Sequence, residues 1–177
     1  GGSLKFDLIT NALLLPKYWE RVKHQNFGTL LVSMDAATKE TYEHIRAGGK
    51  WENLRESLKL IRDNRSRFES VTINMTVMRS NFPEIPQFIE LAEAYGFNAS
   101  FQRIRGLFGN ENIFEMGDRE SLLSVRNILR KEQSRPRRIH VTWGDLLTEL
   151  ADTQDTTTES EAGRTKTSSL SQKPSVA

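Results

Sequence analysis

The segment TLLVSMDA (Thr29–Ala36) decides the fold. Its run of apolar and β-branched residues is typical of a buried β-strand. The ten residues that follow it, ATKETYEHIR (37–46), predict a helix, with Thr38 as its N-cap and with Gly48 and Gly49 placed to end it. A strand that leads directly into a helix is the unit from which parallel α/β folds are built.

The same alternation of strand and helix continues on both sides of this segment. Further strands are predicted at Phe6–Asn11, Val71–Met78, Ala99–Arg105 and Ile139–Thr142, and further helices at Pro16–Lys23, Trp51–Arg65, 85–95 and Arg119–Lys131. The pattern predicts an α/β fold, a partial (β/α) TIM-like barrel of parallel strands with outer helices. We expect the barrel part to cover residues 1–108, a helical or mixed extension to cover 109–152, and a disordered tail rich in serine and threonine to cover 153–177.

The composition excludes several classes of partner. With 25 basic and 23 acidic residues, the chain has no strong attraction for nucleic acid or an anionic membrane. A basic stretch at 126–138 could touch nucleic acid, but a solvated helix face is the better interpretation. No apolar run approaches the ~20 residues of a membrane helix, so we expect a cytoplasmic protein. Gly1 in place of methionine leads us to expect that the natural N-terminus lies upstream.

The chain contains no cysteine, so it cannot form a disulfide or hold an iron–sulfur cluster by itself. Its three histidines, His24, His44 and His140, are far apart and share no ligand spacing. We therefore expect no metal site in this chain.

Polar side chains at the end of the first quoted strand are candidates for ligand binding. Strand alternation places Val32 and Met34 on the face that packs against helices, and Ser33 and Asp35 on the face toward the barrel mouth. A hydroxyl beside a carboxylate is suited to bind a sugar diol. Capping of the following helix is an equally good explanation of these two residues.

The strand Val71–Met78 carries a second set of polar residues. Its alternation puts Thr72, Asn74 and Thr76 on the interior face, where each needs a hydrogen-bond partner. A polar ligand is favoured over exposure at a sheet edge. On the next strand, Gln102 is a further candidate, and for Arg103 a ligand contact and a surface position are equally good interpretations.

Arg46 lies at the end of the helix that follows Asp35. Its guanidinium could reach back over the barrel mouth to a ligand carboxylate. From the residues alone, an arginine that is solvated and favoured by the helix dipole is the better explanation.

The stretch VSMDAATKETYEHIRAGGKWENL (32–54) closely resembles the radical S-adenosylmethionine enzymes, in particular the branch that often carries a SPASM extension. Thr10-Asn11-Ala12 resembles the Thr-Asn-Gly at the end of that family's third strand, with alanine in place of glycine. The segment VMRSN (77–81), followed by PEI (83–85), resembles its fifth strand and next helix, and FQRI (101–104) its sixth strand. The resemblance covers roughly residues 5–108.

This resemblance implies a barrel that binds S-adenosylmethionine across its strand ends. It implies that Ser33 and Asp35 lie near the ribose, that Arg46 approaches the methionine carboxylate, and that Gln102 lies near the adenine. It also implies that Asn74 and Thr76 belong to the fifth-strand region of the site, and that Asn11 closes the third strand. In the family, a Cys-x3-Cys-x2-Cys motif holds a [4Fe–4S] cluster at which S-adenosylmethionine is cleaved reductively to a 5′-deoxyadenosyl radical.

The first two strands of such a barrel and its cysteine motif are absent from this sequence. We therefore expect an inactive portion of a radical enzyme that, when complete, holds the [4Fe–4S] cluster and modifies a peptide or protein with the help of an electron donor. The expected partner is the N-terminal portion of the barrel. The alternative is a non-catalytic, degenerate half-barrel that acts as a binding or partner module.

Overall fold

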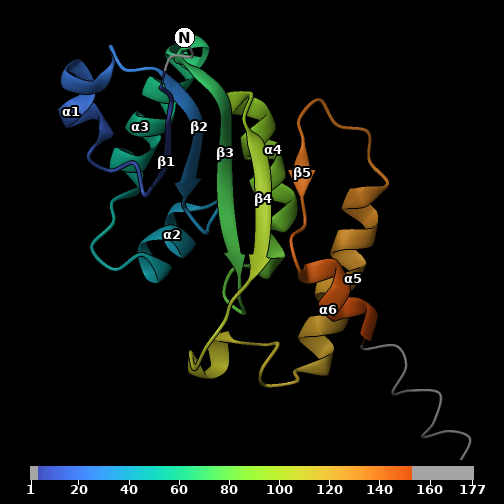
Figure 1. The fold of residues 1–177 in the computed structure, drawn as a ribbon. Coiled ribbons are helices and arrows are strands. Elements are labelled where there is room, and N and C mark those ends of the chain that lie inside the picture. The colour runs from blue at the N-terminus through green and yellow to red at the C-terminus, as the bar shows by residue number, and fades with distance from the viewer. Residues whose placement is uncertain (1–3, 153–177) are drawn as a thin grey trace, which may run out of the picture. The chain divides into compact units, whose positions relative to one another are not determined.

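Five parallel strands form one sheet in the computed structural model, which describes residues 4–152 (Figure 1). They are β1 (Phe6–Thr10), β2 (Phe27–Ser33), β3 (Phe68–Val77), β4 (Asn98–Arg103) and β5 (Val141–Thr142). Their order in the sheet is their order in the chain, and every neighbouring pair is parallel. Parallel neighbours need a crossover connection, and helices supply it. The predicted parallel α/β fold is confirmed.

The crossover helices lie next to one another in chain order. They are α1 (Leu15–Val22), α3 (Trp51–Asp63), α4 (Ile85–Tyr95) and α5 (Arg119–Gln133), while the short α2 (Lys39–Ile45) follows β2. Helix α1 packs beside α3, α3 beside α4, and α4 beside α5. Figure 1 shows α3 and α4 on the same side of the sheet, as successive right-handed crossovers require.

The chain divides into two units, Gly1–Leu146 and Leu147–Ala177. The first contains the whole sheet, so most of the expected extension 109–152 belongs to the same unit as the expected barrel part. Helix α6 (Leu146–Asp152) follows β5, and the expected tail 153–177 lies outside the described residues. Within residues 4–152, no helix has the length and apolar character needed to cross a membrane.

The core lies between the sheet and this helical layer. On β4, the ring of Phe101 meets the ring of Phe88 from α4 edge-on, with 5.5 Å between the centroids. Met75 of β3 pairs with Phe101 and is fully buried, as are Val71 and Val77. The alternate residues of β3 on the opposite face are polar, so the predicted alternation of this strand is confirmed.

The strands begin and end at residues that the hydrophobic pattern did not indicate. β2 begins at Phe27 rather than Thr29, because Phe27 stacks with Trp19 of α1 and lies 5.0 Å, centroid to centroid, from Phe68. It ends at Ser33 rather than Ala36, because Asp35 has a φ of +60° and cannot continue an extended strand. β1 and β4 also end before their predicted ends, whereas α5 continues to Gln133.

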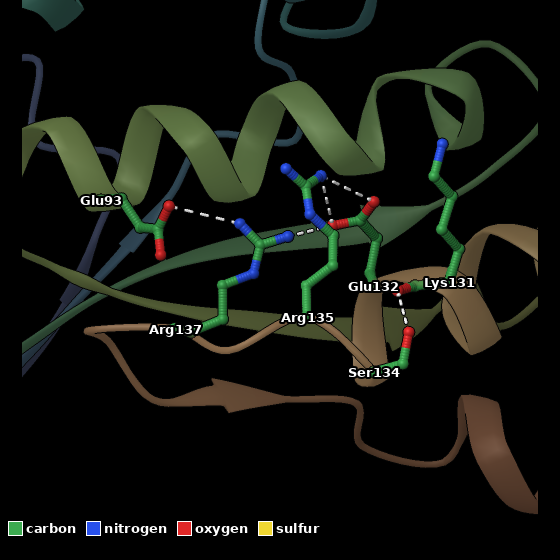
Figure 2. Close-up of polar contacts among 6 residues, drawn as sticks. All are labelled: Glu93, Lys131, Glu132, Ser134, Arg135 and Arg137. Atoms are coloured by element: carbon green, nitrogen blue, oxygen red, sulfur yellow. Dashed lines mark hydrogen bonds and ion pairs between the residues drawn. The ribbon is translucent and has the colours of Figure 1, made fainter.

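A buried carboxylate joins α5 to the segment before β5 (Figure 2). Glu132 is 3 % exposed, and its carboxylate forms ion pairs with Arg137 and Arg135. Arg137 also reaches Glu93 of α4, at 3.2 Å. The interpretation of 126–138 as a solvated helix face is therefore wrong for Arg137, which lies after α5 and whose side chain is only 10 % exposed. Two carboxylates make this burial possible, because a buried cation needs ionic partners.

Candidate ligand-binding site

A cavity of about 540 Å³ lies at the carboxyl ends of β2, β3 and β4, and we call it the larger cavity because a smaller one of about 290 Å³ lies beside it. Its polar lining consists of Asp35, His44, Thr76, Ser80, Gln102, Arg103, Arg105 and Glu111, and its apolar lining of Ile45, Met78, Ile104 and Phe108. Ligands of parallel α/β folds bind outside the carboxyl ends of the strands, and a cavity of this size accommodates a small organic molecule.

Asp35 lies at the centre of this arrangement in a strained conformation. Its φ of +60° is uncommon for a residue other than glycine, and its side chain is nearly buried. One carboxylate oxygen accepts a hydrogen bond from the Thr76 backbone N–H at 2.7 Å, and the other forms an ion pair with Arg46. Strain of this kind persists only where the surroundings hold it in place, and it is concentrated at functional sites.

Asn81 fixes the turn that carries Asp35, and it is completely buried. Its side-chain amide donates to the carbonyl oxygens of Asp35 and Thr76, both at 2.8 Å, and its oxygen accepts from the Met78 backbone N–H at 2.8 Å. One side chain thereby ties the end of β2 to the end of β3. The walls of the larger cavity are held together by a residue that does not line it.

Thr38 and Glu84 fix the start of α2. Thr38 is the N-cap, as predicted, and its hydroxyl accepts from the Thr41 backbone N–H at 3.3 Å. The Glu84 carboxylate accepts from the backbone N–H of Ala37 at 2.7 Å and from the Thr38 hydroxyl at 2.6 Å. Because these residues cap the helix, the alternative that Ser33 and Asp35 cap it is wrong.

A smaller cavity of about 290 Å³ lies beside the larger one, and Ile45 lines both. Its other lining residues are Asn11, Leu13, Tyr42, Arg46, Ala47 and Gly49. Burial raises the pKa of Tyr42 although the nearby Arg46 guanidinium opposes this shift, so the phenol stays neutral at physiological pH. The Nε–H of Arg46 is buried without a hydrogen-bond partner in the described part of the chain.

The bend after β1 keeps the conformation that glycine favours, although alanine occupies it. Ala12 has a φ of +60° and is buried, directly after Asn11 of the smaller cavity. The resemblance implies glycine at this position. The structure therefore has the backbone turn that a glycine would adopt, at some cost in strain.

The predicted site residues fall into three groups. Asp35, Thr76 and Gln102 line the larger cavity, where the Gln102 amide donates to the Thr76 hydroxyl at 3.3 Å. Asn11 and Arg46 line the smaller one. Ser33 and Asn74 line neither cavity. They pair in register on adjacent strands, followed by Ser100 and Thr142, and form a polar row across the sheet.

Several cavity residues were not singled out by the sequence pattern, among them His44, Arg105 and Glu111. Arg105 and Arg103 share one partner, Asp145, at 2.7 and 3.3 Å respectively. Burial alone would raise the pKa of Asp145, but hydrogen bonds from the Arg105 side chain and the Arg103 backbone N–H hold it below its ordinary value. Arg105 lies after the end of β4, so the alternation of that strand gives no signal for it.

No protein-family model matches this chain, and no curated protein matches it either. The function is therefore argued from the site itself.

Proposed function

We propose that this chain supplies the S-adenosylmethionine-binding wall of a (β/α) barrel of the radical S-adenosylmethionine type. The observation that carries the proposal is that Asp35, Thr76 and Gln102, from three adjacent parallel strands and their ends, line one cavity. Asn11 and Arg46 line the cavity beside it. A sheet whose strand order follows the chain order, with its crossover helices side by side, is also the arrangement of one arc of a barrel.

The residues of the two cavities fit such a ligand in charge and hydrogen-bonding capacity. The Asp35 carboxylate can accept hydrogen bonds from the ribose hydroxyls, and the Gln102 amide can both donate to and accept from the adenine. The Arg46 guanidinium lines the smaller cavity on a side chain that is 32 % exposed, so it can donate to the methionine carboxylate. Ser33 and Asn74 lie outside both cavities, so we assign them no ligand contact.

The [4Fe–4S] cluster of such enzymes does not fit the residues of this chain, which has no cysteine. Polypeptide outside this sequence would have to hold it. We therefore assign to this chain the binding and orientation of the cofactor and no chemical step. A peptide or protein substrate and an electron donor would belong to the complete enzyme.

The test is a titration of the ¹⁵N-labelled chain with S-adenosylmethionine and with S-adenosylhomocysteine, followed by NMR. The amide chemical shifts of Thr76, Gln102 and His44 are expected to change. Gln102→Ala should weaken binding about tenfold, the effect of one lost hydrogen bond in a binding site. Gln133→Ala, which removes an exposed glutamine at the end of α5, serves as the matched control and should leave affinity unchanged. Shifts confined to other parts of the sheet, or no shifts at all, would reject the proposal.

A second candidate is a non-catalytic module that completes its sheet with a partner. It is favoured by the apolar side chains that β1 exposes at the edge of the sheet, with Ile9 79 % exposed. Monomeric parallel sheets rarely leave such an edge uncovered.

A further inference from the structure

An apolar groove runs along the free edge of β1, between this strand and α1. We call it the β1 groove; its volume is about 590 Å³, and its lining includes Phe6, Leu8, Ile9, Leu14, Leu15 and Tyr18. Leu14 is 61 % exposed, Phe6 42 % and Tyr18 38 %. Apolar side chains gathered in this way on a surface mark an interaction site.

The backbone of β1 adds hydrogen-bonding groups to this surface. Within residues 4–152, β1 pairs with β2 on one side only, so its other edge presents unpaired N–H and C=O groups. An extended peptide satisfies these groups by adding a strand, and its alternate side chains then enter the adjoining groove.

Two cations border the groove without a neutralising carboxylate. Lys17 Nζ lies 5.5 Å and Arg21 Cζ 5.9 Å from the centroid of the Tyr18 ring. Neither forms an ion pair with another residue of the described chain, whereas Lys5 pairs with Glu69 and Lys23 with Glu20. The border of the groove is therefore positively charged, whereas its interior is apolar. An occupant that carries an acidic group complements the charge of the border.

We propose that the β1 groove binds an extended strand of another polypeptide chain that carries apolar residues and at least one carboxylate. The strand adds to the sheet beside β1, its apolar side chains cover Ile9 and Tyr18, and its carboxylate lies against Lys17 and Arg21. A second copy of this chain is a poorer occupant, because a two-fold interface would bring a second Lys17–Arg21 pair to the same place. The inference rests on the second candidate function, the module that completes its sheet with a partner, because in the barrel proposal the preceding strand of the same barrel covers this edge.

The test uses two fluorescein-labelled heptapeptides, Glu-Val-Ser-Val-Ser-Val-Glu and its counterpart with lysine at both ends. Fluorescence anisotropy with the full chain should show the acidic peptide binding about tenfold more tightly than the basic one, a difference that weakens with added salt. The double variant Lys17→Glu, Arg21→Glu should reverse this preference. The matched control Arg55→Glu, Lys59→Glu carries the same two changes four residues apart on the exposed face of α3, and it should keep the preference.

A second variant tests the apolar half of the proposal. Ile9→Lys changes a side chain that is 79 % exposed, so the fold should persist while the affinity for the acidic peptide falls. The proposal is overturned if neither peptide binds at millimolar concentration, or if the charge reversal leaves the preference unchanged. It is also overturned if sedimentation velocity shows a dimer that Ile9→Lys dissociates, since the occupant is then a second copy.

Discussion

The Asp35 carboxylate and the Arg46 guanidinium form an ion pair that joins the wall of the larger cavity to the wall of the smaller one. The Asp35 side chain is 6 % exposed and that of Arg46 is 32 % exposed. Breaking a buried ion pair leaves an uncompensated charge, at a cost that exposure reduces.

We expect Asp35→Asn to lower the free energy of unfolding by about 2 kcal/mol, a value reduced from the fully buried case because a third of Arg46 is exposed. Urea denaturation measures this change. Glu52→Gln, which breaks the exposed Lys39–Glu52 pair, serves as the control and should cause a much smaller loss. Equal losses in the two variants would contradict a structural role for the Asp35–Arg46 pair.

The Asp145 carboxylate should make stability depend on pH in the acidic range. Burial opposes its ionisation, but hydrogen bonds from Arg105 and Arg103 lower its pKa below the ordinary value. A lowered pKa in the folded state contributes stability above the unfolded-state value of ~3.9, and this stability is lost as the pH falls through the folded-state pKa. The stability difference between the wild type and Asp145→Asn should therefore be constant near neutral pH and shrink below about pH 4. Urea denaturation at a series of acidic pH values measures this stability difference. If the difference stays constant, the pKa of Asp145 is not lowered in the folded state.

Gly144 should tolerate no side chain. It has a φ of +52°, and a Cβ atom there would lie 2.6 Å from the Phe101 carbonyl oxygen. Gly144→Ala is expected to cost about 3 kcal/mol, the sum of backbone strain and this clash. Gly109 has a φ of +53° and open space around it, so Gly109→Ala isolates the strain, about 1 kcal/mol. Thermal unfolding of the two variants compares them directly. The same melting temperature for both would mean that the backbone moves enough to remove the contact between the Cβ atom and the Phe101 carbonyl oxygen.

Local sequence patterns predicted the order of the strands and helices correctly, because each element depends on local periodicity. They also recovered Asp35, Thr76 and Gln102 as cavity residues, because the carboxyl ends of parallel strands converge. Ser33 and Asn74 lie two residues before Asp35 and Thr76 and line neither cavity, so their predicted ligand contacts stay predictions.

Contacts between segments distant in the chain could not be predicted. Asp145 meets Arg103 across 42 residues, and nothing in the local pattern of either residue indicates the other. The burial of Arg137 depends in the same way on Glu93, which is 44 residues earlier. Such contacts depend on how the helices pack, and periodicity carries no information about that packing.

The buried Glu132 should be among the most sensitive charged residues of the chain. Glu132→Gln leaves Arg137 with Glu93 as its remaining carboxylate partner and should lower the free energy of unfolding by about 3 kcal/mol (Figure 2). Glu93→Gln is the matched control, since Glu93 is 31 % exposed and contacts only Arg137 among the residues drawn there. Chemical denaturation should rank Glu132→Gln well below Glu93→Gln in stability; the reverse order would place the main ionic contact at Glu93.

Asn81 affects the shape of the larger cavity indirectly. It holds the backbone of Asp35 and Thr76 in place without lining either cavity itself. In a mutational scan scored for ligand binding, Asn81 would therefore rank with the cavity residues, and a map of ligand contacts alone would leave that result unexplained. The shape of the site therefore depends on this one amide as well as on the side chains that line the larger cavity.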